Sequence, residues 1–160
     1  PIIEGFPLTE KQTDIDHILN IGRICLASEQ LGASEAILEK TQTYVLERHQ
    51  FGRAIGSFQA IKHRCADMFV AIEAARSAVY AAATAGEDDK VELALIAKAY
   101  ATDAFFYVAG HAIQLHGGIG FTWEYPLHYF FKRARANRAV FGSSSRDYAA
   151  LADQLLGDAA

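Results

Sequence analysis

The chain contains 160 residues, of which 51% are hydrophobic and 21% charged, and its formal net charge at pH 7 is −4. This length suits one domain with a single core. The negative charge argues against a general nucleic-acid binder, and no apolar run approaches the roughly 20 residues of a membrane span. The two cysteines, Cys25 and Cys65, follow no metal or disulfide pattern, which favours reduced core thiols in a cytoplasmic protein.

The beginning of the chain predicts a lead-in followed by a helix. The sequence opens at Pro1 without an initiator Met, which we interpret as the start of a fragment or of a domain from a longer protein. We expect residues 1–13 to be extended and residues 14–160 to form the domain. Thr13 or Asp14 is the expected N-cap of the first helix.

Helical periodicity dominates the rest of the chain. Helices are expected at about 14–48, 58–85, 89–116, 126–138 and 143–156, with Ser57 as the N-cap of the second and Ser143 opening the last. Residues 49–56 are expected to form a loop, and no alternating strand pattern is present. Long helices joined by short loops favour antiparallel neighbours. The predicted fold class is all-α: an antiparallel four-helix bundle with additional short C-terminal helices.

Two glycine features need an explanation. Gly22 falls inside the first expected helix, where it costs about 1 kcal/mol relative to Ala. Gly117, Gly118 and Gly120 fall directly after the third helix, although one glycine suffices for a C-cap. Because glycine lets the backbone approach other groups closely, the surplus indicates a bound ligand or a tightly packed neighbouring chain.

Other candidate motifs are weaker. The sequence has no metal-ligand spacing and no nucleophile elbow, so no metal is expected. His63 and His111 lie in helical patterns, where a structural role is the favoured interpretation. The basic run 132–138 can bind phosphate, but arginines spaced by alanines on a helix are more typical of a solvated or subunit-contacting face.

Several short motifs resemble, in their order and spacing, the C-terminal domain of acyl-CoA dehydrogenases. They are Arg48–Gly52, Phe58–Ile61, Ala66–Met68, Gln114–Phe121 and Glu124–Pro126. Each motif is weak alone, but together they are specific, and the resemblance covers essentially the whole chain. In that family this helical domain follows an N-terminal helical domain and a β-domain, which the present sequence does not contain.

The resemblance implies FAD as cofactor and α,β-dehydrogenation of an acyl-CoA thioester. It also implies reoxidation by electron-transferring flavoprotein, and a homo- or hetero-oligomer, either a tetramer or an α2β2 assembly in which some residues reach the FAD of a neighbouring subunit. The implied FAD contacts are Arg48, Phe51, Gln59, Gln114, Leu115, His116, Gly117, Gly118, Ser143 and Ser145. The implied substrate contacts are Asn20, Arg23 and Gly142. An arginine fork suits the FAD pyrophosphate.

The family's catalytic glutamate has no counterpart here. The alignment places Phe141 at its commoner position and Gly22 at the alternative one. Neither residue takes a proton, and removal of the substrate α-proton requires a positioned base. The family's Arg-Asp pair appears here as Lys132-Arg133, a charge reversal. The acids nearest in sequence, none of which aligns with either position, are Glu4, Glu29, Glu35 and Glu124.

Three interpretations follow. The chain resembles the glutamate-lacking subunits of actinobacterial heteromeric acyl-CoA dehydrogenases, which act on steroid side-chain CoA thioesters. In the second interpretation, the base lies in the absent N-terminal region or the substrate class is unusual. In the third, the chain is a helical structural or oligomerisation module that has lost flavin. The intact set of Arg48, Gln59 and Gln114–Gly118 favours an acyl-CoA dehydrogenase subunit over such a module.

Overall fold

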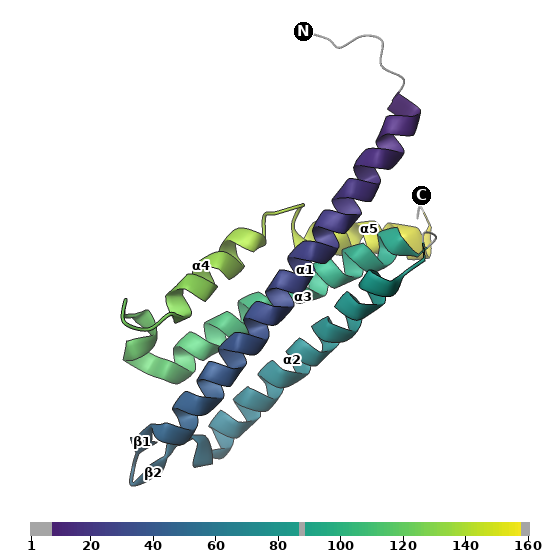
Figure 1. Ribbon diagram of the computed structural model, residues 1–160. Coiled ribbons are helices and arrows are strands. Elements are labelled where there is room, and N and C mark those ends of the chain that lie inside the picture. Colours follow the sequence, from purple (N-terminus) through teal and green to yellow (C-terminus); the bar gives the residue numbers. More distant parts are fainter. Residues whose placement is uncertain (1–7, 87–88, 158–160) are drawn as a thin grey trace.

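The computed structural model describes residues 8–86 and 89–157, with side chains described from Ile15 onward. Five α-helices account for most of this part of the chain (Figure 1). They are α1 (Leu8–Glu47), α2 (Gln59–Thr84), α3 (Lys90–His116), α4 (Leu127–Asn137) and α5 (Ser144–Leu156). The connections contain a small hairpin, β1 (His49–Gln50) and β2 (Arg53–Ala54), and the 3-10 turns η1 (Ile55–Ser57) and η2 (Gly117–Phe121). The predicted all-α class is confirmed.

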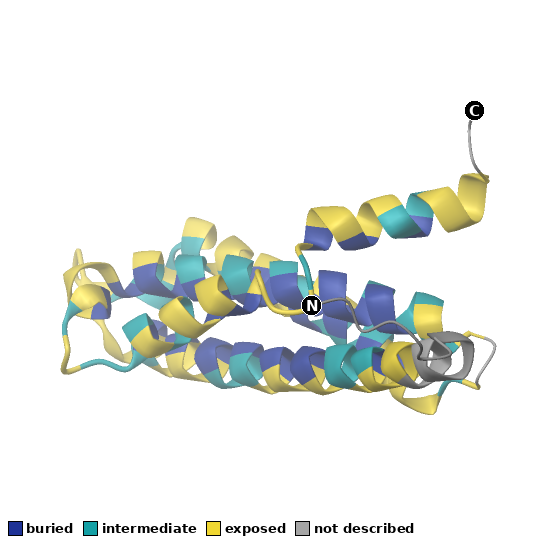
Figure 2. Ribbon diagram, turned by 90° about the horizontal axis from the view of Figure 1, so that it is seen from above, coloured by how far each residue is buried: buried dark blue, intermediate teal, exposed yellow. Residues whose placement is uncertain are grey.

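Of the three long helices, α2 runs antiparallel to α1 and α3, which run in the same direction (Figure 1). The short helices α4 and α5 pack on α3. The two short helices follow one another along α3, so that together they take the fourth position of the bundle. Figure 2 shows α5 on the outside, with most of its outer surface exposed. The turn between α4 and α5 divides this fourth position into two parts, and it lies next to α1.

The core is centred on α3, whose small residues let neighbouring helices approach closely. Its buried side chains include Ala97, Ala101, Phe105 and Val108. By length and composition the stretch Lys90–Phe121 is apolar enough to cross a membrane, which corrects the expectation that no stretch approaches that length. Most of it is buried among the other helices, the pattern of a core helix and weak ground for a membrane span.

The first helix begins earlier than predicted. It starts at Leu8, so residues 8–13 are helical rather than extended, while residues 1–7 lie outside the described part. The expected caps Thr13 and Asp14 therefore fall inside the helix. Leu, Glu, Lys and Gln are good helix formers, and they continue the helical propensity toward the N-terminus.

The loop predicted at 49–56 contains the hairpin, in which His49 pairs with Ala54 and Gln50 with Arg53. Its two turn residues, Phe51 and Gly52, have φ of 54° and 77°, the backbone that a tight hairpin turn requires. Two-residue strands are too short to show an alternating pattern in the sequence.

The predicted starts of two helices have different outcomes at the level of the cap. The last helix begins at Ser144, as expected, and the Ser143 side chain caps it by accepting a hydrogen bond from the Arg146 N–H at 3.3 Å. Ser57 does not cap α2, because its hydroxyl donates to the Ala54 carbonyl at 2.7 Å and Phe58 takes the N-cap position.

The predictions for the cysteines and for two histidines are also corrected in part. Cys25 is exposed and Cys65 half-buried, so neither is a core thiol. His111 lies 3.1 Å from an Arg64 nitrogen and is structural, whereas His63 is exposed.

Candidate functional site

Phe141 and Gly22 meet in space although they are far apart in the sequence. Phe141 lies in the turn between α4 and α5, and Gly22 lies in the middle of α1. A Cβ added to Gly22 would lie 2.7 Å from the Phe141 Cζ and 3.2 Å from each Cε. The helix thus has a notch at Gly22 that the aromatic ring fills. This contact explains why a glycine stands inside a long helix, and it joins the two positions at which the alignment places the base.

A groove of about 540 Å³ lies beside this contact. Its lining comes from α1, α3, the turn between α4 and α5, and the start of α5: Asp16, Leu19, Asn20, Arg23, Val91, Leu95, Phe141, Gly142, Arg146, Asp147 and Ala150. The three residues expected to contact substrate, Asn20, Arg23 and Gly142, are therefore brought together. Arg23 donates a hydrogen bond of 2.7 Å to the Asn20 Oδ1, and among the described residues its buried Nε has no partner.

A buried ion pair lies behind the groove. Lys98 of α3 has no exposed surface, and its Nζ lies 2.7 Å from Oδ2 of Asp147, which is also buried. The same ammonium donates to the Gly142 carbonyl. The sequence analysis missed this pair. The available signal was a lysine on the apolar face of a helix, in register with buried Ala94, Ala101 and Phe105.

The other acids do not replace the missing glutamate. Glu29 receives two hydrogen bonds from Arg133, of 2.6 and 2.7 Å, and the Arg133 hydrogen bond is the main cause that lowers the pKa of Glu29. Glu35 forms a 2.6 Å ion pair with Arg76. Glu4 lies outside the described residues.

Asp16 is a further acid at the groove, which the sequence motifs did not single out. It lines the groove six residues before Gly22, about 9 Å away along the helix axis.

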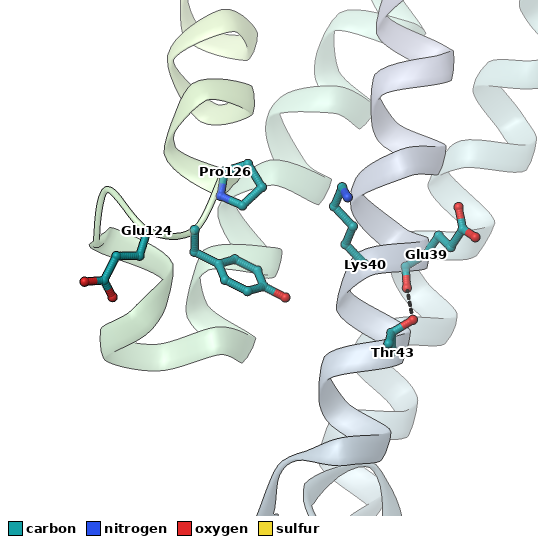
Figure 3. A pocket seen from close by; sticks show the side chains of 6 residues that line it. Glu39, Lys40, Thr43, Glu124 and Pro126 are labelled. Atoms are coloured by element: carbon teal, nitrogen blue, oxygen red, sulfur yellow. Dashed lines mark hydrogen bonds between the residues drawn. The ribbon is translucent and has the colours of Figure 1, made fainter.

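Glu124 belongs to a separate hollow of about 460 Å³ between α1 and the loop before α4. The hollow is lined by Glu39, Lys40, Thr43, Glu124, Tyr125 and Pro126. In Figure 3 the Glu124 side chain points away from α1, and Thr43 donates to the Glu39 carbonyl at 3.1 Å. This hollow shares no lining residue with the groove at Phe141.

The basic run on α4 is partly engaged within the chain. Arg133 pairs with Glu29 of α1, which supplies a partner for the reversed charge at this position. The Lys132 ammonium lies 4.5 Å from the centre of the Trp123 ring. Arg138 lies 4.6 Å from the centre of the Phe106 ring.

A second group of expected site residues gathers at the hairpin end of the bundle. Here α1 and α3 end and α2 begins (Figure 1). The exposed members are Arg48, Phe51, Gln59, Gln114, Gly117 and Gly118, and the Phe51 side chain is 92% exposed. These guanidinium, amide and backbone donors suit an anionic dinucleotide. We call this set the end cluster.

The three glycines that follow α3 are explained in different ways. Gly117 ends α3 with φ of 64°, which favours glycine. A Cβ on Gly120 would lie 2.9 Å from the Ile113 carbonyl oxygen, so internal packing requires glycine there. Gly118 faces open space. Of the surplus noted in the sequence, only Gly118 has no reason within the chain.

His116 and Leu115 do not extend the end cluster. The His116 side chain is buried, stacks on Tyr44 at a ring distance of 4.1 Å, and its Nδ1 bonds the Ala112 carbonyl at 2.7 Å. Desolvation lowers the pKa of His116. Leu115 packs against the hydrophobic core. Both side chains are therefore engaged within the chain, and their contact with a cofactor stays a prediction.

The groove and the end cluster are widely separated. The helix from Gly22 to Glu47 spans about 38 Å at 1.5 Å per residue. Ser143 and Ser145, which were expected to contact FAD, are exposed at the start of α5 on the groove side. The residues expected to hold the cofactor thus form two sets that are too far apart to hold one dinucleotide.

The described chain is thus a helical bundle with a groove on one side and a set of exposed hydrogen-bond donors at one end. The family model "Acyl-CoA dehydrogenase, C-terminal domain" matches residues 13–156, and the chain therefore belongs to this family. FAD is the cofactor of the family.

Three relatives illustrate the membership. The acyl-CoA dehydrogenase IpdE2 of Mycobacterium tuberculosis is 45% identical over 126 residues, covering 79% of this chain and 39% of that protein. A variant of the Tcur3481–Tcur3483 steroid ACAD aligns with a TM-score of 0.82 and 35% identity, over 88% of this chain and 40% of that one. The ChsE4–ChsE5 complex of Mycobacterium tuberculosis gives a TM-score of 0.82 and 28% identity, over 89% and 39%. The chain thus spans about two-fifths of these relatives.

Proposed function

We propose that this chain belongs to a subunit of an FAD-dependent acyl-CoA dehydrogenase, and to the subunit type that lacks the catalytic base. The contact between Phe141 and Gly22 carries the proposal. A hydrocarbon ring fills the point at which the family places its glutamate. Of the described residues that line the groove, Asp16 and Asp147 are the carboxylates, and Asp147 is held by Lys98. The substrate α-proton is then removed in a homologous partner subunit.

The two separated sets of residues support an oligomer with shared cofactor sites. FAD, when bound, accepts a hydride from the substrate. The end cluster of one subunit would hold the pyrophosphate and adenosine of a neighbour's FAD, with Arg48 as the charged fork and Gln59 and Gln114 as amide donors. Gly118 leaves its backbone N–H open to a close approach. Ser143 and Ser145 lie near the FAD of the chain's own subunit.

The substrate and partners follow from the same reasoning. The groove carries Arg23 and Arg146, which suit an anionic CoA thioester. The resemblance to the Tcur3481–Tcur3483 steroid ACAD and to the ChsE4–ChsE5 complex favours a steroid side-chain thioester and an α2β2 assembly. We place the enzyme in the cytoplasm, with electron-transferring flavoprotein as its electron acceptor.

The test is co-expression of the full-length protein with an adjacent dehydrogenase reading frame that keeps the glutamate. We expect a yellow mixed oligomer that oxidises acyl-CoA, whereas the full-length protein alone should give no turnover. A colourless mixed oligomer would contradict the proposal and favour a structural module without flavin.

A gain-of-function variant tests the missing base directly. In a complex whose partner glutamate is replaced by Gln, Phe141→Glu is expected to restore turnover, because a carboxylate then stands at the family's position. Phe141→Gln is the matched control, since it has the same length without the base. Equal turnover of the two variants would refute the assignment of Phe141.

A further inference from the structure

The Lys98–Asp147 pair needs a reason beyond stability. Both side chains are almost completely buried, and Nζ and Oδ2 are 2.7 Å apart. Burying two charges costs desolvation, and an apolar pair of similar volume is often at least as stable. A buried pair that is kept in an apolar core can instead specify one arrangement of the elements that it joins.

The Lys98–Asp147 pair connects α3 to the turn between α4 and α5. Phe141 and Gly142 have φ of 57° and 101° in this turn. A positive φ is unusual for a bulky residue such as Phe, and it persists only where the surroundings fix it. Lys98 donates to the carbonyl of Gly142, the residue that follows Phe141. One ammonium therefore holds both the strained turn and the first turn of α5.

A second contact holds α5 from the same helix. The Asp103 carboxylate of α3 accepts hydrogen bonds from the Ser144 hydroxyl at 2.8 Å and the Tyr148 hydroxyl at 3.1 Å. These bonds position the helix, but they do not reach the turn itself. The direct hold on the turn comes from Lys98.

We propose that the Lys98–Asp147 pair is a positioning element that keeps the Phe141 ring in the Gly22 notch and so keeps the position of the base closed. Lys98 is a positioning residue, since it acts through the turn. The effect of this positioning on catalysis rests on the proposed function, whereas the hold of the pair on the Phe141 ring does not depend on it. An acyl thioester in this groove meets a fixed hydrocarbon wall.

A double-mutant cycle in the mixed oligomer of the full-length protein tests the hold on the ring. Gly22→Ala is expected to lower Tm by about 2–8 °C, because its Cβ meets the ring. With Lys98→Met and Asp147→Leu the ring is free to move, and the same substitution should lower Tm by less than half as much. Lys98 does not contact Gly22, so this coupling passes through the ring.

The control is the same cycle in a Phe141→Ala background, where the effects should add. Additive effects with Phe141 present would overturn the proposal, because a pair that only stabilises the fold does not alter the cost at Gly22. If the apolar pair does not fold, Lys98→Met with Asp147→Asn takes its place, because it removes the hold on the Gly142 carbonyl, keeps the side-chain volumes and leaves no buried charge.

A kinetic measurement separates this proposal from the proposed function. In the complex with Phe141→Glu and no partner base, replacing the pair should reduce kcat by about 100-fold, because the new carboxylate is no longer positioned. KM should change less than kcat, since most of the residues that line the groove lie on α1, α3 and α5 rather than in the turn. Equal kcat with and without the pair would refute positioning. No turnover even with the pair intact would refute the proposed function, and the Tm cycle would still decide the positioning.

Discussion

The contact at Gly22 predicts that Gly22→Ala destabilises the fold when Phe141 is present and stabilises it when Phe141 is removed. In Gly22→Ala the new Cβ lies 2.7 Å from the Phe141 Cζ, where ordinary contact begins at 3.4 Å. Overpacking of this kind costs about 1–3 kcal/mol, and the anchored turn places the cost near the upper end. Replacing Gly by Ala in a helix returns about 1 kcal/mol. The net loss is about 1–2 kcal/mol, or about 2–8 °C in Tm.

The sign should reverse in Phe141→Ala, because only the helix gain of about 1 kcal/mol then remains, a rise of about 2–4 °C. Scanning calorimetry and urea unfolding measure both. Gly32→Ala is the matched control on the same helix, because no atom lies within 4 Å of its added Cβ, and it should stabilise both backgrounds equally. A stabilising Gly22→Ala in the parent protein would show that the ring leaves the notch readily and would refute the reasoning.

Three other predictions follow from the structure. Burial and Asp103 raise the pKa of Tyr148 from 10.0 to about 12; its contribution to stability is complete below pH 10 and lost as pH rises towards 12, so Tyr148→Phe should flatten that part of an alkaline unfolding curve. The Arg133 hydrogen bond lowers the pKa of Glu29 below 4.5; the contribution of the pair is present above pH 4.5 and lost below it, and Arg133→Met should reduce acid sensitivity in low salt but less in high salt. Gly118→Ala should leave Tm unchanged, because its Cβ meets open space, but lower the FAD content of the oligomer, measured by absorbance.

Local features were predictable from the sequence. The apolar stripes placed α2 and α3 within a few residues, because side chains at helical spacing share one face. Pro126 and Ser143 marked the starts of α4 and α5, because the start of a helix depends on neighbouring residues. The start of α1 was predicted wrongly, because helix-forming residues continue back to Leu8 and no sharp signal marks a start at Thr13.

The composition of the site could also be anticipated. Arg48, Gln59 and Gln114 were singled out by their motifs, and the structure brings them to one end of the bundle. What the motifs did not reveal is that this end lies about 38 Å from Gly22 along α1. Separation along a long helix follows from its rise, but the association of three chain segments at one end needs the fold.

The sequence by itself determined that α1 carries an interior glycine and that Phe141 takes the place of an acid. Only the tertiary structure decided that each explains the other, with the ring seated in the notch. It likewise decided that Lys98 finds Asp147 and the Gly142 carbonyl in the core. The physical reason is range. Helices and caps depend on residues within a few positions. A side-chain contact between α1 and the turn before α5 forms only after both have packed on α3.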